Sequence, residues 1–412
     1  MDEHDRRREQ GSRRALLLPV YVPTALLSLC EGLLLPTLPL FALQFEGISF
    51  AVASLVLAAS AIGTLVADVP AGMLLGRMGL KPTMMLGATM VTISTFMLAF
   101  AGSVPELVGY RLVAGVGAAM WAISRHAFIT ESIPIAQRGR AISVFGGINR
   151  IGVFGGPAVG GLIGSLFGLQ ESFVVAGVLG LFALFISWRY VRDTRVVVHS
   201  AHSVRWGLVR DMVRTNWRDL SSASIAQTFA QMIRAGRQTI IPFYGATVLG
   251  LSAADVGIIQ SASSSVDMLL FIPAGILMDR FGRKVAAVPS FAIMAVGMAA
   301  IPFTNSFWTL LGAAAVLGLG NGIGSGTMMT LGADLAPPGA TGEFLGIWRL
   351  IGDTGRAGGP LAVGGLTDGV GFGPTAYILA LFGLASSAIL AVMVRETRIA
   401  PTTDPPPTGG SP

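Results

Sequence analysis

Charged residues are scarce in this chain. Only 12% of its 412 residues are charged and 52% are hydrophobic, whereas an ordinary soluble domain carries about 25% charged residues. Buried helices of a large soluble protein are one alternative source of apolar sequence, but such helices rarely run far without a polar face. The composition therefore favours a protein that is surrounded largely by lipid.

Cysteine and histidine are also scarce. Cys30 is the single cysteine, so no intramolecular disulfide can form. His199 and His202 form an H-x-x-H pair without cysteines or clustered carboxylates, which favours a solvated loop over a metal site. No arrangement of Ser, His, Asp or Cys indicates catalysis, and the glycine run GLGNGIGSG (318–326) lacks the spacing of a dinucleotide-binding loop. We therefore expect no enzyme activity, no metal and no cofactor.

Long apolar stretches are abundant. About 20 apolar residues in a helix cross a hydrocarbon core of about 30 Å, and twelve stretches of this kind are separated by short polar breaks. The sequence therefore predicts an all-α integral membrane protein with twelve transmembrane helices. The stretches lie near residues 16–43, 50–73, 83–101, 106–129, 141–167, 172–190, 221–248, 254–277, 286–303, 307–331, 344–366 and 373–393.

Basic residues occur in alternate breaks only. Lys and Arg are absent near 44–49, 102–105, 168–171, 249–253, 304–306 and 367–372, and the intervening breaks, the N-terminal tail and residues 189–219 are basic. By the positive-inside rule, both termini and the central basic segment are cytoplasmic. The net charge of +6 thus indicates membrane orientation rather than nucleic-acid binding. Two Lys against 26 Arg suggest a GC-rich genome and hence a bacterial cytoplasmic membrane.

The second half of the chain repeats the first at an offset of 203 residues. Pro39 aligns with Pro242 and Pro157 aligns with Pro360, with no gap between them. Because six spans separate each matched pair, the halves have the same orientation and form a parallel repeat. The predicted organisation is a tail (1–14), a six-helix half (15–191), a linker (192–219), a second six-helix half (220–394) and a disordered tail (395–412).

Two matching loops carry a resemblance to a known family. GMLLGRMGLK (72–81) and GILMDRFGRK (275–284) resemble the cytoplasmic loop motif of the major facilitator superfamily, which joins helices 2 and 3 and recurs between helices 8 and 9. The second copy is complete, whereas Gly76 replaces the usual Asp and Leu80 the usual basic residue in the first. The motif residues, with the preceding acid of helix 2, are Asp68, Gly72, Arg77, Gly79, Lys81, Gly275, Asp279, Arg280, Gly282, Arg283 and Lys284.

The stretch GVFGGPAVGG (152–161) narrows the resemblance. Such a run of helix breakers would destabilise a soluble helix, but in lipid it lets two helices approach closely. It is similar to the helix 5 motif of the superfamily's antiporters, and PTLP (36–39) resembles helix 1 of the twelve-helix drug:proton antiporters. A passive packing seam is the alternative to a kink that repacks during transport. The matching positions are Gly152, Gly156, Pro157, Gly160 and Gly161.

Ionisable side chains inside the spans are the candidate functional residues. Each costs at least about 2.5–3.5 kcal/mol at mid-membrane, although any of them could instead form a buried structural pair. The resemblance implies that helices 1, 4, 7 and 10 line a central cavity, and Gln227, Gln231, Arg234 and Gln238 share one face of helix 7. The predicted cavity residues are Glu31, Arg111, Gln227, Gln231, Arg234 and Arg237.

Glu31 and Asp267 are the candidate proton carriers. Burial favours the protonated form of a carboxyl group and a nearby arginine favours the ionised form. Glu31 is related to Arg234 by the 203-residue offset, so we expect these two groups to face each other. Asp267, at similar depth in helix 8, is the rival carrier.

Two ion pairs are predicted between the halves. The family packs helix 2 on helix 11 and helix 5 on helix 8. At 1.5 Å per residue, Asp68 and Arg349 share one depth, and Arg150 and Asp267 share another. We therefore predict the pairs Asp68–Arg349 and Arg150–Asp267, each holding the halves together in one state.

The combined interpretation is a proton-coupled exporter that works by alternating access. A single acid in an apolar cavity favours lipophilic cations, whereas Arg111, Arg234 and Arg237 could hold an anionic metabolite. The alternatives are therefore an exchanger or uptake symporter for a small organic anion or sugar, and, in another class, a non-transporting receptor or scaffold. Expected partners are membrane lipid, a small molecule and protons, with no nucleic acid and a monomeric state.

Overall fold

The computed structural model describes residues 17–132, 135–191, 207, 210–214, 217–337 and 339–396, except for the side chains of 130–143 and 145. Within these residues all regular secondary structure is helical, so the all-α prediction is confirmed. The predicted tail 1–14, most of the linker 192–219 and most of the tail 395–412 lie outside the described residues.

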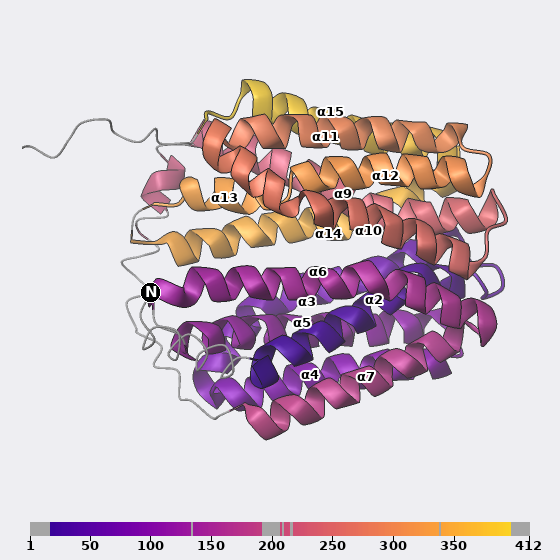
Figure 1. The fold of residues 1–412 in the computed structure, drawn as a ribbon, viewed down its shortest axis with the longest axis horizontal. Helices are drawn as coiled ribbons and strands as arrows, with labels where there is room; N and C mark the ends of the chain where they lie inside the picture. The colour runs from indigo at the N-terminus through magenta and orange to yellow at the C-terminus, as the bar shows by residue number, and fades with distance from the viewer. Residues whose placement is uncertain are drawn as a thin grey trace, which may run out of the picture.

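The helices form two groups that lie side by side (Figure 1). A short π-helical turn, Leu17–Tyr21, leads into the first group. That group is α2 (Val22–Ala42), α3 (Phe50–Met78), α4 (Leu80–Met97), α5 (Val104–Ser132), α6 (Ile135–Leu166) and α7 (Leu169–Tyr190). The second group is α9 (Trp217–Thr247), α10 (Ala253–Phe281), α11 (Arg283–Ala300), α12 (Phe307–Ile323), α13 (Thr327–Asp334), α14 (Thr341–Val370) and α15 (Phe372–Val392).

Nine helical segments are long and apolar enough to cross a membrane among the described residues. Helices α6, α9 and α14 fall outside this set although each has about thirty residues. These three helices carry several charged residues, including Arg150, Arg234, Arg237, Arg349 and Asp353. Charge, rather than shortness, therefore distinguishes these three helices from the nine apolar segments.

Helix boundaries follow the 203-residue offset. Adding 203 to the bounds of α3 and α4 gives those of α10 and α11, and the 3₁₀ turns Leu98–Phe100 and Ile301–Phe303 correspond in the same way. Gly79 and Gly282 join the equivalent helices with φ of 88° and 106°, a backbone conformation that side-chain-bearing residues rarely adopt. The loop motif thus needs glycine at these two positions to turn the chain between consecutive helices.

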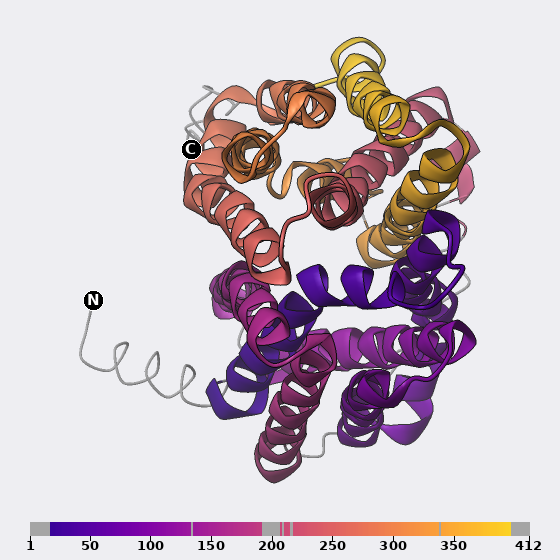
Figure 2. The same ribbon diagram turned by 90° about the vertical axis from the view of Figure 1, so that its right-hand side faces the viewer.

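The two ends of the helix bundle differ in their connections. We call one the short-loop end, where residues 43–49, 101–103, 248–252 and 304–306 connect the helices, and the other the basic end, which contains the turns at Gly79 and Gly282. Two contacts join the groups along their length, α3 with α14 and α6 with α10. Figure 2 views the bundle along its helices and shows these pairs at the boundary.

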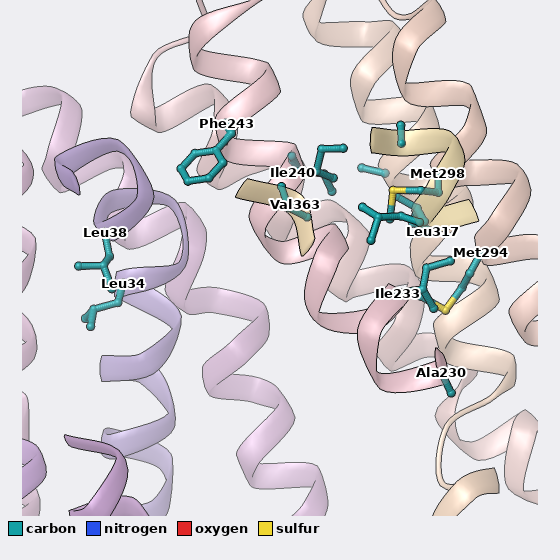
Figure 3. Packing of buried hydrophobic residues seen from close by; sticks show 14 of the residues in the cluster. Leu34, Leu38, Ala230, Ile233, Ile240, Phe243, Met294, Met298, Leu317 and Val363 are labelled. Atoms are coloured by element: carbon teal, nitrogen blue, oxygen red, sulfur yellow. The ribbon is translucent and has the colours of Figure 1, made fainter. Parts of the chain in front are cut away.

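The largest buried apolar cluster spans both groups. In the second group Ile233 of α9, Met294 and Met298 of α11 and Leu317 of α12 pack together, as Figure 3 shows. Met294, Met298 and Leu317 are fully buried, and close packing of such side chains holds helices together in lipid, where the hydrophobic effect does not drive their association. The buried apolar side chains thus form packing contacts within the second group and continue across the boundary into the first.

The predicted span 307–331 is interrupted. Residues 324–326 separate α12 from α13, and Gly326 has φ of 79°. The equivalent segment of the first group, in α5, is continuous. The glycines of GLGNGIGSG permit the break, which leaves the Gly324 carbonyl and the Ser325 hydroxyl available to arginine side chains.

Candidate functional site

A cavity of about 550 Å³ lies between the two groups. This volume suits a drug-sized molecule, since ligand pockets span about 300–1,000 Å³. Helices α2, α3, α4, α5, α6, α9 and α14 contribute to its lining, and many of the lining residues are leucine, alanine or valine. Its ionisable and amide side chains are Glu31, Arg111, Arg125, His126, Asn149, Gln238, Arg349 and Arg356.

Aromatic rings join the groups at the short-loop end. Phe50 of α3 lies 5.4 Å from Phe243 of α9 and 5.0 Å from Phe372 of α15, measured between ring centroids. Tyr244 packs 5.7 Å from Phe372 and donates a hydrogen bond to the Thr304 carbonyl at 2.9 Å. The two halves are therefore in contact at the short-loop end, outside the cavity. In the other direction, the polar lining of the cavity extends to Arg125 and Arg349, toward the basic end.

Asp368 ties the groups together at the same end. Its two carboxylate oxygens accept hydrogen bonds from the Phe50 and Ala51 backbone N–H groups, at 2.9 and 2.8 Å, at the start of α3. Desolvation acts to raise the pKa of Asp368, but hydrogen bonds from Ala51, Ser49 and Phe50 outweigh it, so the pKa lies below its ordinary value. A carboxylate from one group thus caps a helix of the other.

Replacing Asp368 with Asn is expected to open the short-loop end. A hydrogen bond to a charged group contributes about 1.5–3 kcal/mol, so loss of the charge should shift the equilibrium between conformations by about tenfold or more. Distances between spin labels across this end measure the shift. Glu106→Gln is the matched control, because Glu106 accepts from Gly102 and Ser103 within its own group; an equal shift in both variants would contradict a tie at Asp368.

The lowered pKa of Asp368 also fixes the sign of its pH dependence. The hydrogen bonds from α3 favour the ionised form of Asp368. They are therefore fully formed above the ordinary aspartate pKa of about 3.9, and they are lost as the pH falls through the lower pKa that Asp368 has when it accepts them. Between pH 5 and 8 we expect no titration at this site. Any pH dependence of transport between pH 5 and 8 must therefore arise from another group. We expect the Asp368→Asn variant to show the same pH profile of transport as the wild type, and measuring that profile checks this.

Glu31 and Arg111 line the cavity at neighbouring depths. Glu31 lies 11 residues before the end of α2 and Arg111 lies 7 residues after the start of α5, or about 16 and 10 Å from the short-loop end at 1.5 Å per residue. The two groups interact electrostatically. Glu31 is exposed, and it is the single carboxylate of the cavity lining.

Arg234 is not the partner of Glu31. The Arg234 guanidinium donates to the Gly324 carbonyl at 3.0 Å and lies over the Phe291 ring at 5.0 Å, and its electrostatic partners are Asp267, Arg237 and Arg150. The expectation that Glu31 and Arg234 face each other is therefore wrong. Sequence equivalence relates positions in different halves, but it does not bring them into contact.

Asp267 is the centre of a cationic cluster. Arg150 contacts it across the boundary at 3.1 Å, Arg237 at 3.7 Å and Asn321 at 2.5 Å. Arg150 also donates to Ser325 at the α12–α13 break, and Arg234 lies nearby. Three guanidinium groups thus share one carboxylate, and the structure brings together the predicted pair Arg150–Asp267.

The predicted polar face of α9 divides between two environments. Only Gln238 lines the cavity, whereas Gln227, Gln231, Arg234 and Arg237 are absent from its lining. Gln227 is buried beside Gly352 of α14, and Gln231 faces the same helix. The placement of these four in the cavity is therefore not seen in this conformation, because close contact with α14 and the Asp267 cluster holds them away.

The second predicted pair lies toward the basic end. Arg349 approaches Asp68 to 3.9 Å, with side chains 39% and 15% exposed. Further along α14, Arg356 pairs with Asp353 at 3.4 Å. Both arginines line the cavity, so each cavity arginine of α14 has a carboxylate beside it.

The two loop motifs make different contacts. Arg283 pairs with Asp334 at 2.8 Å and with Asp279 at 3.9 Å, and Glu396 accepts from the Arg283 and Lys284 backbone N–H groups. Lys284 also donates to the Ala391 carbonyl.

The remaining motif residues lie at the surface or in open surroundings. Gly72 and Gly275 face open space. Lys81 is half-buried, and Arg77 and Arg280 are exposed. Within the described residues, the Arg77 side chain forms no hydrogen bond or ion pair.

The helix 5 glycines face two different helices. A Cβ on Gly152, Gly156 or Gly160 would lie within 3 Å of α2 atoms, and a Cβ on Gly161 would lie within 3 Å of the Ala253 carbonyl in α10. After Pro157, the Ala158 N–H is satisfied by the Ser261 hydroxyl at 2.9 Å, across the boundary. The motif therefore packs one half internally and also joins it to the other.

The equivalent glycines of α14 were missed by the sequence analysis. Gly355 and Gly359 approach α9 in the way that Gly152 and Gly156 approach α2, and Gly364 approaches Phe50 of α3 across the boundary. The 203-residue offset applied to the helix 5 motif would have found all three.

Alanine substitutions are expected to separate the two roles. Gly156→Ala should destabilise the first half by about 1–3 kcal/mol through overpacking. Gly161→Ala should instead open the short-loop end and impair transport while the thermal midpoint changes little. Gly155→Ala is the control, because a Cβ there meets nothing within 4 Å. Thermal unfolding and transport rates of the three variants check this, and equal midpoints for Gly155→Ala and Gly156→Ala would contradict it.

Comparison with known proteins decides the family. The family profile of the Major Facilitator Superfamily matches residues 21–252 and 223–411. The chain belongs to this superfamily. It is accordingly a membrane transporter of small molecules and not an enzyme, as its resemblance implied.

Relatives within the superfamily differ in their named substrates. An uncharacterized transporter of Methanocaldococcus jannaschii, MJ1560, is 23% identical over 90% of this chain and 96% of that protein. The quinolone resistance protein NorA of Staphylococcus aureus is 22% identical over 71% and 74%. The riboflavin transporter RibZ of Clostridioides difficile is 22% identical over 68% and 72%.

Solved structures share the fold. The D-xylose-proton symporter superposes with a TM-score of 0.76 at 16% identity, covering 93% of this chain and 98% of that one. The nucleoside transporter NupG, solved as a point mutant, gives a TM-score of 0.76 at 14% identity over 92% and 100%. At such identities the likeness concerns architecture alone.

Proposed function

We propose that the protein is a proton-coupled transporter that exports small molecules by alternating access. The two helix groups rock against each other around the cavity. Export is supported by the helix 5 glycine motif and by a drug-resistance protein among the relatives. In the structure the two halves are in contact at the short-loop end, and the cavity extends toward the basic end. We therefore take this conformation to be the one that is closed at the short-loop end.

Glu31 carries the proposal. Its carboxylate is exposed to the cavity, and among the described residues its side chain forms no hydrogen bond or ion pair that protonation would break. Asp267 is a poorer carrier, because protonation would leave Arg150 and Arg237 without their shared carboxylate. A proton can therefore bind and leave Glu31 at little structural cost.

The topology belongs to the same proposal. All twelve predicted spans cross the membrane, with α12 and α13 together forming the tenth, and the halves extend over 15–191 and 220–394. The basic end faces the cytoplasm, as the positive-inside rule requires, and so do both termini. The protein acts as a monomer in a bacterial cytoplasmic membrane.

Uptake with protons is the second candidate. The cavity lining holds four arginines and one carboxylate, which suits a substrate with anionic groups. If such an anion displaced Glu31 from the field of Arg111, protonation of Glu31 would assist its binding, and proton and anion would move together. The sign of the proton flux therefore separates the two candidates.

The test uses protein reconstituted in liposomes with a trapped pH dye. Ethidium and benzoate serve as cationic and anionic probes. Export by exchange predicts proton flux opposite to the probe flux, and uptake predicts flux in the same direction. Binding without movement of either probe or proton would favour the remaining alternative, a receptor, and would overturn the proposed function.

A further inference from the structure

We infer that the cavity binds zwitterionic amphipathic molecules, with the anionic group of the ligand at Arg111 and its cationic group at Glu31. This inference rests on the proposed transport function and specifies the substrate class of the same cavity. Its basis is a pair of opposite charges that line the same cavity at neighbouring depths without contacting each other.

The pair is left open in the structure. Neither the Glu31 nor the Arg111 side chain forms a hydrogen bond or an ion pair within the part of the chain that is described, although the two interact electrostatically. The Arg111 Nε atom is buried and has no hydrogen-bond partner. The Arg111 side chain as a whole is half-buried and lines the cavity, so a ligand acceptor can approach it from the cavity side.

The arginines that α14 contributes to the cavity already have carboxylates beside them, and Arg125 and His126 of α5 are engaged in contacts of their own. Arg349 has Asp68 beside it and Arg356 has Asp353. Glu31 and Arg111 therefore offer the ligand one negative and one positive group. A ligand with a single charge would satisfy one of these groups and leave the other without a counter-charge.

The α5 side of the cavity supplies hydrogen-bond donors. Trp121 lines the cavity, its Nε1 atom is buried, and that atom has no partner. Arginine and tryptophan side chains can donate but cannot accept. Ala114 and Ala118, between Arg111 and Trp121, leave space along this face. At the depth of Arg111, a ligand carboxylate lying against α5 thus meets a donor and the two small alanine side chains.

The remaining lining selects an apolar body. Leu34, Leu35 and Leu38 of α2 and Val91 of α4 face the same cavity as Glu31. Because no direct Glu31–Arg111 contact exists, the two charges of the ligand must be separated by several bonds rather than lie on one carbon atom. An aromatic dipeptide has this separation and an apolar body that fits about 550 Å³.

The test compares four forms of one molecule. The probes are the zwitterion Phe-Phe, its cationic methyl ester, its anionic N-acetyl derivative and the uncharged N-acetyl methyl ester. Binding to the full-length detergent-solubilised protein is measured by calorimetry. We expect the zwitterion to bind at least tenfold more tightly than each singly charged form.

Variants assign each charge to its residue. Arg111→Gln should abolish the preference for Phe-Phe over its methyl ester, and Glu31→Gln should abolish the preference over the N-acetyl derivative. Arg395→Gln is the matched control and should keep both preferences, because Arg395 pairs with Asp219 and lies outside the cavity lining. Binding of the uncharged form and the thermal midpoint report whether each variant remains folded. If Arg111→Gln does not fold, Arg111→Lys takes its place, and it should retain the preference for Phe-Phe over its methyl ester.

Equal binding of all four forms, no binding of the zwitterion, or tighter binding of a singly charged form would each overturn this inference. None of these results would affect the transport of ethidium or benzoate with protons in liposomes, which tests the proposed function separately.

Discussion

Glu31→Gln is expected to abolish probe transport driven by a pH gradient while exchange of probe across the membrane continues. The amide resembles the protonated carboxyl group in shape and charge, so it fills the same place but cannot release a proton. Coupling and binding are separate free energies. The substitution should remove coupling completely, whereas it removes only one contact of the bound probe and should leave exchange measurable. Liposomes loaded with unlabelled ethidium and diluted into labelled ethidium measure exchange, and a pH jump measures driven transport.

Glu106→Gln provides the control for this substitution. Glu106 lies at the short-loop end, outside the cavity lining, and caps its own helix. It should retain transport driven by a pH gradient. Equal pH-driven transport in Glu31→Gln and wild type would contradict a proton site at Glu31, and loss of exchange as well would make Glu31 a binding residue only.

Asp267→Asn is expected to be the most destabilising single substitution among the charged residues of the boundary. Removing one partner of a buried ion pair costs about 3–5 kcal/mol, and Asp267 is the shared carboxylate of Arg150 and Arg237. The variant would bring three guanidinium groups together without an anion, since Arg234 depends on the same carboxylate. Thermal unfolding in detergent should show a clearly lowered midpoint.

A second substitution tests the cause. If excess positive charge is the reason, adding Arg150→Gln to Asp267→Asn should recover part of the lost stability, and the double variant should be more stable than the sum of the single effects predicts. Additive effects, or an unchanged midpoint in Asp267→Asn, would contradict the charge-sharing arrangement. Transport that remains in Asp267→Asn should keep its wild-type pH dependence.

The sequence predicted the architecture well because that information is periodic. The apolar stretches and the 203-residue offset anticipated the helices, and the equivalent bounds of α3 and α10 follow that offset. The glycine motif predicted close helix contact at positions such as Gly156 and Gly160, where a side chain cannot fit. These features depend on residues near each other in the chain or at a fixed repeat.

The sequence did not predict which charged side chains lie near each other around the cavity. The repeat suggested Arg234 opposite Glu31, but Arg234 faces the α12–α13 break, and Arg111 interacts with Glu31 instead. Which way a side chain points depends on helix rotation, which the repeat does not determine. Asp368 was not anticipated either, because an exposed carboxylate near a loop gives no local sign that it caps a distant helix.

The most direct test measures the conformation without a cargo. Spin labels are placed at Gln44 and Asn305 across the short-loop end, in a background where the single buried cysteine, Cys30, is replaced by Ala. A second pair at Met78 and Phe281 reports on the basic end. If Glu31 is the proton site that controls alternating access, lowering the pH from 8 to 5 should change the two distances in opposite directions. The Glu31→Gln variant at pH 8 should then give the low-pH distances of the unsubstituted chain. A Glu31→Gln variant whose distances still shift with pH as the unsubstituted chain's do would contradict the account.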